Sequence, residues 1–229
     1  MGLRNWAEIK KMNDMARSYL TLFVARTIFS RTKLRAHIRK MGEILVLDVG
    51  CGEGGPVALV AKHNKLKVVG LDIFRPSVDK AKSLESYQDL ILGDVRYLPI
   101  RNKSVDVAVS VAVLEHLEKP DGEALLSELE RVSKRMTMIS CPVGKWEQDA
   151  FDDNPYQEHK YVWTVEELKS KGFHNMNGVG LKGMSGRLWG TLLRSPVGWL
   201  VGILTLLGTM FSYYIPDIAS NVIAWKEML

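Results

Sequence analysis

The chain has 229 residues, of which 46% are hydrophobic and 25% are charged. This balance indicates one globular domain with modest additions and excludes a disordered chain. Its two cysteines, Cys51 and Cys141, have no CxxC partner, which disfavours a disulfide framework or a structural zinc site. Residues 1–10 lack the apolar run of a signal peptide, so we expect a protein of a reducing, cytoplasmic compartment.

The net charge of +5 is distributed unevenly along the chain. Residues 1–40 contain ten Lys/Arg and two Asp/Glu, whereas the remaining 189 residues contain 21 basic and 24 acidic groups. A basic arm of this kind suits an anionic membrane surface or a nucleic acid. It is equally compatible with an ordinary solvated helix face.

Short apolar runs alternate with helix-like stretches from Ile44 onward. The runs are rich in β-branched residues, almost continuously apolar and bounded by Gly, Pro or Asp, as expected for buried strands. The predicted strands are 43–50, 67–73, 89–94, 104–113 and 135–143, with weaker candidates at 174–183 and 221–228, and the predicted helices are 54–64, 76–86, 122–133 and 164–173. Strands and helices alternating at this spacing indicate an α/β domain with a mostly parallel sheet.

Two regions lie outside this alternation. Residues 17–40 mix apolar and basic side chains in a long helical segment, and Val197–Ile215 contains 19 residues without a formal charge. The sequence therefore predicts four parts: a basic helical arm at 1–42, an α/β core at 43–183, an apolar helical insertion at 184–219, and a final core strand at 220–229.

A glycine-rich loop, DVGCGEGG at residues 48–55, directly follows the first predicted strand and opens a helix. Glycines at such a turn let backbone N–H groups approach a ligand without obstruction by Cβ atoms. Gly50, Gly52 and Gly55, with Asp72 about twenty residues further on, satisfy the GxGxxG fingerprint of NAD-binding proteins. The loop by itself is compatible with NAD or with S-adenosylmethionine (SAM).

Three further features favour SAM. Asp48 lies two residues before the first glycine, where a dinucleotide site normally has an apolar residue and where an acid can accept hydrogen bonds around the cationic amino-acid end of SAM. Asp94 ends the third predicted strand, where a carboxylate can accept a hydrogen bond from an adenine amine. The fourth predicted strand runs into VAVLEHLEKP, residues 111–120.

Four segments carry a family resemblance: VLDVGCGEG, VVGLDI, LILGDVRYLPI and SVDVAVSVAVLEHLEKP. In order and spacing they resemble the motifs of class I SAM-dependent methyltransferases, particularly the small-molecule group that includes the quinone-biosynthesis methyltransferases. The resemblance covers residues 43–143, and QEHKYVWTVEELKSKGF is similar to the stretch before the family's sixth strand. It implies a Rossmann-like, doubly wound seven-stranded sheet, mostly parallel with the last strand antiparallel, to which the N-terminal helical arm and the apolar helical insertion are additions.

The resemblance implies a cofactor site made of ten residues: Asp48, Gly50, Cys51, Gly52, Gly54, Asp72, Ile73, Asp94, Val95 and Val111. The loop glycines would lie under the methionine part of SAM, supported by Asp48. Asp72 would bind the ribose hydroxyls, and Asp94 with the backbone at Val95 would hold adenine. Val111, at the end of the fourth strand, would lie close to the cofactor.

Catalytic residues are less well marked than cofactor residues. His116, in the turn after the fourth strand, and His159, on the loop after the fifth, are candidate general bases. The alternative is that Glu115 and His116 only shape the turn. No metal-ligand spacing is visible, so no metal is expected. The Asn/Asp-Pro-Pro-Tyr/Phe turn of nucleobase-amine methyltransferases is replaced by VAVLEH, and no base-stacking platform is visible, which disfavours nucleic acid as a partner.

The apolar insertion bears on the acceptor. In the implied fold the sixth and seventh strands are antiparallel neighbours, so a segment between them must leave and return on the same side. Interfacial helices, or a re-entrant hairpin broken at Pro196, therefore fit better than one membrane crossing. We expect residues 188–215 to cap the substrate pocket and to dock, with residues 17–40, on an anionic membrane surface.

These features predict a methyltransferase for a small, apolar or lipid-like acceptor, peripherally associated with a membrane. One alternative is a soluble metabolite or protein acceptor, with the insertion as a homodimer interface. A second is a non-catalytic SAM-binding scaffold. The sequence leaves the accepting atom open among O, N, C and S.

Overall fold

The computed structural model describes residues 44–63, 66–144, 148–150, 153–180 and 211–228, together with residues 182, 200, 207 and 208. The predicted arm at 1–42 and most of the predicted insertion at 184–219 lie outside the described residues. The four-part division of the chain therefore stays a prediction.

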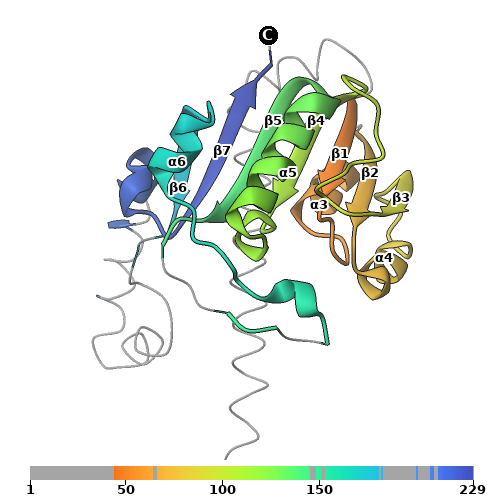
Figure 1. Cartoon of the computed structure of the whole chain (residues 1–229), viewed down its shortest axis with the longest axis horizontal. Coiled ribbons are helices and arrows are strands. Elements are labelled where there is room, and N and C mark those ends of the chain that lie inside the picture. The colour runs from red at the N-terminus through yellow and green to blue at the C-terminus, as the bar shows by residue number, and fades with distance from the viewer. Residues whose placement is uncertain are drawn as a thin grey trace, which may run out of the picture.

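Seven strands of the described residues form one sheet, in the order β3-β2-β1-β4-β5-β7-β6 (Figure 1). The strands are β1 Ile44–Val49, β2 Leu66–Asp72, β3 Asp89–Leu92, β4 Val105–Val111, β5 Ser133–Pro142, β6 Asn175–Val179 and β7 Asn221–Glu227. The first five strands are parallel, whereas β7 pairs antiparallel with both β5 and β6. The predicted seven-stranded sheet with an antiparallel last strand is confirmed.

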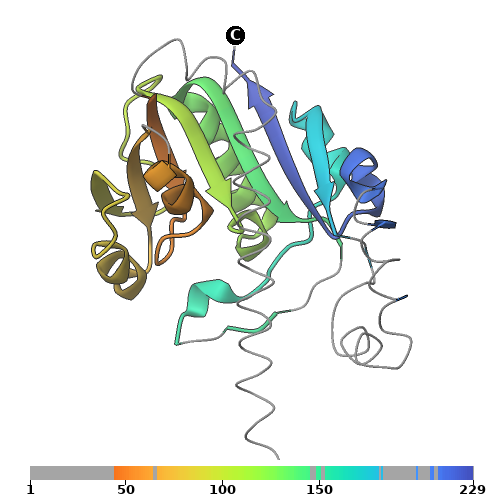
Figure 2. The same ribbon diagram turned by 180° about the vertical axis from the view of Figure 1, so that it is seen from behind.

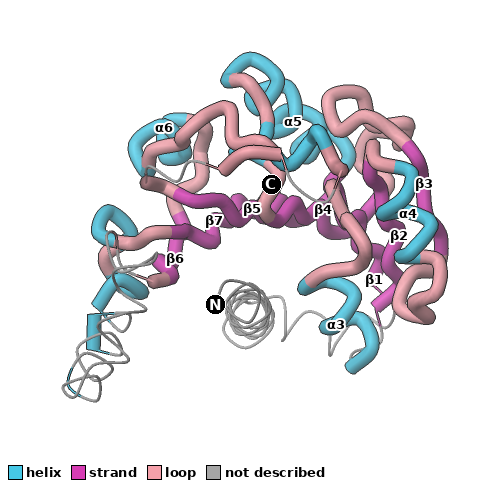
Figure 3. Tube along the Cα trace, turned by 90° about the horizontal axis from the view of Figure 1, so that it is seen from below, coloured by secondary structure: helices cyan, strands magenta, loops and turns pink. Residues whose placement is uncertain are grey.

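Helices lie on both faces of the sheet, as the doubly wound prediction requires. The α-helices are α3 Pro56–His63, α4 Arg75–Ala81, α5 Lys119–Val132 and α6 Val165–Ser170, and the short 3-10 helices are η1 Leu114–His116, η2 Pro155–Gln157 and η3 Pro216–Ile218. Figure 3 shows α5 and α6 on one face and α3 on the other, and α3 is seen from its own side in Figure 2. The central strands β1 and β4 are almost continuously apolar, as expected for strands with both faces buried.

Local signals set several helix ends. The Thr164 side chain accepts from the Glu167 backbone N–H, and the Glu167 side chain accepts from the Thr164 N–H, so the predicted capping box of α6 is confirmed. Gly172, with φ of +89°, follows this helix in the left-handed conformation that favours glycine. The helix predicted at 122–133 begins three residues earlier, at Lys119, because Pro120 is tolerated in a first turn.

The second predicted helix, 76–86, is shorter than expected. It ends at Ala81, after which Ser83 and Leu84 donate backbone bonds to residues three positions earlier. The Ser83 hydroxyl also donates to the Lys80 carbonyl, a side-chain bond that competes with helix continuation. The early end lets residues 84–88 turn back toward the glycine loop, where Leu84 and Tyr87 face Gly54.

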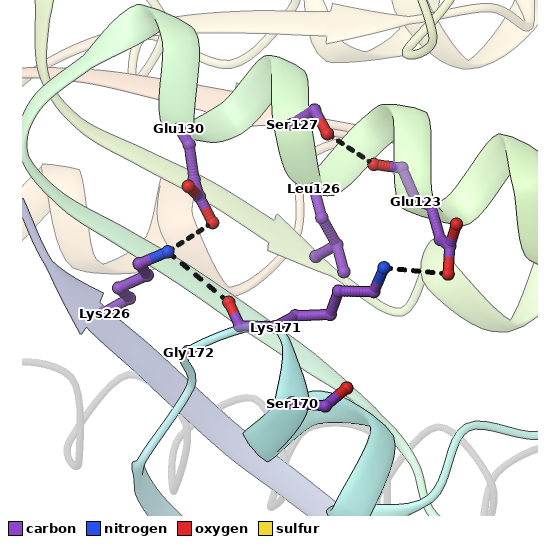
Figure 4. Close-up of a pocket in the computed structure, with 8 residues that line it drawn as sticks. All are labelled: Glu123, Leu126, Ser127, Glu130, Ser170, Lys171, Gly172 and Lys226. Carbon is purple, nitrogen blue, oxygen red and sulfur yellow. Dashed lines mark hydrogen bonds and ion pairs between the residues drawn. The ribbon is translucent and has the colours of Figure 1, made fainter.

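The α5 and α6 layer is held by packing and by ion pairs. A Cβ at Gly122 would lie 2.6 Å from Cζ2 of the fully buried Trp163, so α5 approaches this ring closely only because Gly122 has no side chain. On the outside, Figure 4 shows a charged hollow where Lys171 pairs with Glu123 and Lys226 pairs with Glu130, each at 2.9 Å. These charges already have partners, so the hollow serves to join α5, α6 and β7.

The predicted insertion was expected to contact a membrane. Among the residues that the structure describes, no helix is long and apolar enough to span a bilayer. The described part of the insertion includes residues 211–214, which are helical, and η3.

Candidate functional site

A pocket lies at the carboxyl ends of β1, β2 and β4, where ligands bind in open α/β sheets. Its enclosed volume is about 180 Å³, below the roughly 300 Å³ of a typical small-molecule site, so a larger ligand would extend beyond the enclosed part. Six predicted residues line it: Gly50, Asp72, Ile73, Asp94, Val95 and His116. The other six are not among its lining residues: Asp48, Cys51, Gly52, Gly54, Val111 and His159.

The glycine loop needs its glycines for two different reasons. Gly50, Gly52 and Gly54 all have positive φ values, of 75°, 55° and 98°, which side chains rarely adopt. A Cβ at Gly50 would lie 2.2 Å from Cγ2 of Val113, so this glycine makes room for the turn after β4. A Cβ at Gly52 would meet no described atom within 4 Å. Gly52 therefore presents open backbone.

Asp72 connects the loop to the pocket. Its carboxylate accepts from the Gly52 N–H and from the Phe74 N–H, each at 2.8 Å. An ionised carboxylate offers about four lone-pair directions, so acceptor capacity remains on a side chain that lines the pocket. The position suits hydrogen bonds from a pair of ligand hydroxyls.

Asp48 lies near the end of β1, two residues before the first loop glycine. It is 3% exposed, and the Tyr87 hydroxyl donates to its Oδ2 at 2.7 Å. Burial raises the pKa of Asp48 to about 7, although the Tyr87 hydrogen bond acts in the opposite direction. Cys51 is also buried, and burial raises the pKa of its thiol. Both buried side chains anchor the loop segment in the core, and Tyr87 is a supporting residue that the sequence analysis missed.

Asp94 is held by an arginine that was not predicted. Arg96 donates to both carboxylate oxygens of Asp94, the shortest distance being 2.7 Å, and its Nη1 lies 3.1 Å from Asp121. The hydrogen bonds from Arg96 lower the pKa of Asp94. Asp94 therefore lines the pocket as the partner of Arg96 in an ion pair. Arg96 and Asp121 line the same pocket.

The turn after β4 explains why Val111 does not line the pocket. Ala112 has a φ of +55° and donates its N–H to the Ser140 carbonyl at 2.8 Å. This left-handed conformation is unfavourable for alanine. It turns the chain so that Ala112 and Val113 line the pocket. Strain of this kind is often concentrated at functional sites.

The two candidate catalytic histidines are neighbours, although 43 positions separate them. The ring centroids of His116 and His159 lie 4.9 Å apart. The Nδ1 of His116 is 3.0 Å from the Glu158 carbonyl, and because a carbonyl can only accept, Nδ1 carries the proton. Burial lowers the pKa of His116 to about 4. The ring is therefore neutral at pH 7.

Glu115 is the third member of this group. It is 4% exposed, and burial raises the pKa of its carboxyl to about 8. Its Oε2 has no hydrogen-bond partner among the described residues.

A loop at residues 153–160 closes the pocket and was only partly predicted. Asn154, Tyr156, Gln157 and Lys160 line the pocket. The Asn154 side chain accepts from the Tyr156 N–H at 3.0 Å and so caps η2, which the Asn-Pro dipeptide could have signalled. The Lys160 N–H donates to the Glu115 carbonyl in η1 at 2.8 Å. This contact between the loop and η1 could not be predicted from the sequence.

The comparisons with known proteins agree with this geometry. Residues 47–140 match the family model described as a methyltransferase domain. The chain is 27% identical over 170 residues to 24-methylenesterol C-methyltransferase 2 of Arabidopsis thaliana, an alignment of 65% of this chain and 46% of that protein. It is 29% identical over 129 residues to a sterol 24-C-methyltransferase of Saccharomyces cerevisiae, covering 53% and 33% respectively. The chain thus spans between a third and a half of the length of these curated relatives.

A solved structure shows the same fold. The crystal structure of a SAM-dependent methyltransferase from Archaeoglobus fulgidus aligns with a TM-score of 0.52 at 17% identity, over 90% of this chain and 99% of that chain. The strand order and the glycine loop define a nucleotide-cofactor domain of the class I methyltransferase type. With the family match, residues 47–140 form a methyltransferase domain of the class I SAM-dependent type. The Arabidopsis and yeast relatives bear sterol names, so the resemblance to quinone-biosynthesis enzymes stays a prediction.

SAM is the methyl donor of this family, and the residues present fit it. The unused acceptor capacity of Asp72 lies in the pocket, and Gly52, which donates its N–H to Asp72, presents open backbone next to this lining residue. The Asp94–Arg96 pair adds a hydrogen-bond acceptor and a positively charged side chain to the lining of the same pocket.

Proposed function

We propose that the chain transfers a methyl group from SAM to a small apolar acceptor. The observation that carries this proposal is the pocket that adjoins the glycine loop, Asp72 and the His116 turn at one edge of the sheet. SAM, when bound, supplies an electrophilic methyl group on a sulfonium sulfur. The protein's main task in such a displacement is to align donor and acceptor.

The cofactor residues divide by position. Gly50, Asp72, Ile73, Asp94 and Val95 line the pocket and would contact SAM directly. The other predicted residues, Asp48, Cys51, Gly52, Gly54 and Val111, would act through the loop and the strand ends. Gly52 is the exception, since its open backbone could also meet the ligand.

His116 and His159 are the proposed catalytic pair. The Glu158 carbonyl orients the His116 ring and leaves its Nε2 lone pair available. A neutral imidazole can accept a proton from an acceptor hydroxyl or from a protonated amine. His116 lines the pocket, and His159 lies beside it.

The nature of the acceptor rests on two observations. The Arabidopsis and yeast relatives are named for sterol substrates. The described end of the insertion exposes large apolar side chains, including Phe211 at 64%, Tyr214 at 72%, and Ile215 and Ile218. Apolar surface of this kind, together with the basic residues of the 1–40 segment, supports peripheral docking on an anionic membrane and a lipid-like acceptor.

Calorimetry with SAM tests the cofactor assignment. Asp72→Asn should weaken SAM binding at least tenfold, whereas Asp89→Asn, an exposed carboxylate at the start of β3, should leave it unchanged. NAD binding without SAM binding would overturn the proposal. Conversion of SAM to S-adenosylhomocysteine with a lipid extract, compared with a polar metabolite extract, tests the acceptor class. SAM binding without turnover in either extract would favour a non-catalytic scaffold.

Vesicle sedimentation tests the membrane contact. The full chain should bind anionic phospholipid vesicles more strongly than zwitterionic ones, and high salt should weaken this binding. Replacing Phe211 and Tyr214 by serine should reduce binding, whereas replacing Tyr97, which is 76% exposed elsewhere, should not. A dimer that binds neither anionic nor zwitterionic vesicles would favour the dimer-interface alternative.

A further inference from the structure

Glu115, His116 and His159 form a compact donor cluster beside the pocket. One donor atom from each, two imidazole nitrogens and a carboxylate oxygen, can be chosen so that all lie within 4.8 Å of one another. Two chain segments supply them, η1 and the loop that follows β5. The backbone N–H groups of Lys160 and Tyr161 donate to the Glu115 carbonyl at 2.8 and 3.3 Å and so hold the segments together.

One oxygen of the Glu115 carboxyl is buried without a hydrogen-bond partner among the described residues. The residue is 4% exposed, and its Oε2 has no hydrogen-bond partner among the described residues. Buried polar atoms are almost always paired, and an uncompensated buried carboxylate is costly. A bound cation would satisfy this oxygen.

The orientation of His116 points in the same direction. Its Nδ1–H donates to a backbone carbonyl at 3.0 Å, which is the outer contact that metal-binding histidines usually make. This bond fixes the tautomer and leaves the lone pair on Nε2 free to act as a ligand.

We propose that Glu115, His116 and His159 bind a divalent transition-metal cation of the zinc type. Two imidazole nitrogens and one carboxylate oxygen are a donor set that suits zinc and its neighbours better than magnesium or calcium, which prefer oxygen ligands. Ligand atoms around tetrahedral zinc lie about 3.4 Å apart. The side chains therefore need to close by about 1.4 Å at most from the 4.8 Å limit.

Three protein ligands leave one coordination position, as in catalytic zinc sites. Because His116 lines the pocket, this position would face the space for the acceptor. The role of the open position rests on the proposed methyl transfer. With the cation bound, His116 and His159 would act as its ligands and not as general bases, and the open position would take an oxygen of the acceptor and lower the pKa of its hydroxyl. Binding of the cation itself does not depend on that function.

Metal titration of the full chain tests the proposal. After treatment with a chelator, Zn²⁺ is titrated by calorimetry, and Co²⁺ by its visible absorption. One cation per chain is expected, with tetrahedral Co²⁺ bands and no thiolate-to-metal charge-transfer band. Glu115→Gln and His159→Gln should each weaken Zn²⁺ binding at least tenfold. His174→Gln, an exposed histidine outside the cluster, is the matched control and should bind like the wild type.

Several results would overturn the proposal: no saturable Zn²⁺ binding by the wild-type chain, unchanged binding by both cluster variants, or a thiolate band that points to Cys51 or Cys141. Thermal melts and SAM calorimetry on the same variants show whether they are folded. Loss of zinc with SAM binding retained supports the site. Zinc binding by a wild-type chain that fails to bind SAM would refute the proposed function and leave the metal site standing.

Discussion

Gly52→Ala separates the cofactor role of the glycine loop from its structural role. The residue has a φ of +55°, and a Cβ there would meet no described atom within 4 Å. The cost to folding is therefore the backbone strain alone, about 1–2 kcal/mol for a left-handed alanine. For a chain of this size that loss corresponds to a fall in Tm of roughly 2–8 °C.

The variant should also bind SAM more weakly, and this loss is separate from the cost to folding. If the cofactor lies over this loop, the new methyl group occupies its space, and the Kd for SAM should rise at least tenfold, or about 1.4 kcal/mol. Gly50→Ala provides a contrast, because its Cβ would lie 2.2 Å from Val113 Cγ2. The resulting overpacking adds about 1–3 kcal/mol to the strain. Gly50→Ala should therefore lower the free energy of unfolding more than Gly52→Ala does.

Gly55→Ala is the matched control. Its backbone is not left-handed, and a Cβ there would also meet no described atom within 4 Å, so we expect a stability change below about 1 kcal/mol and unchanged SAM binding. The assays are thermal melts and SAM calorimetry on all three variants. A Gly52→Ala protein that binds SAM like the wild type would refute the placement of the cofactor over the loop.

Three further predictions concern the carboxylates. Tyr87→Phe removes the donor to buried Asp48 and should lower the free energy of unfolding by about 1.5–3 kcal/mol at pH 8; a change below about 0.5 kcal/mol in urea unfolding would contradict this. Because burial raises the pKa of Asp48 from 3.8 to about 7, its contribution to stability falls as pH rises through that interval; Asp48→Asn should remove this part of the pH dependence, and identical slopes would argue against it. Burial acts to raise the pKa of Glu167, but hydrogen bonds from Lys119 and Tyr161 outweigh this and lower it to about 2, so the stabilisation is present above pH 4.5 and is lost toward pH 2. The stability difference between wild type and Glu167→Gln should accordingly shrink as pH falls from 5 to 3, and a constant difference would count against this assignment.

Features encoded by local pattern were predictable. The Thr164–Glu167 capping box and the glycine that follows α6 depend on a few adjacent residues, and the buried parallel strands show as continuous apolar runs. The pocket's place at the strand ends follows from the alternation of strands and helices. These inferences need no knowledge of which distant side chains meet.

Contacts between distant segments were not predictable. The burial of Asp48 under Tyr87 requires the early end of α4. The pairing of Arg96 with Asp121 joins the end of the third strand to α5. Neither contact produces a periodic pattern in the sequence. A single charged or aromatic residue at a turn has many compatible partners.

The sequence by itself determined the layered α/β fold, the glycine loop and the acidic residues that follow the strands, because apolar periodicity and turn chemistry act over a few neighbouring positions. The tertiary structure alone decided what those acids face: Asp72 the pocket, Asp48 the interior, Asp94 an arginine. It also brought His159 to Glu115 and His116 across 43 positions. Such a meeting depends on how β5 and the loop after it return to the edge of the sheet, and that path is set by packing of the whole domain.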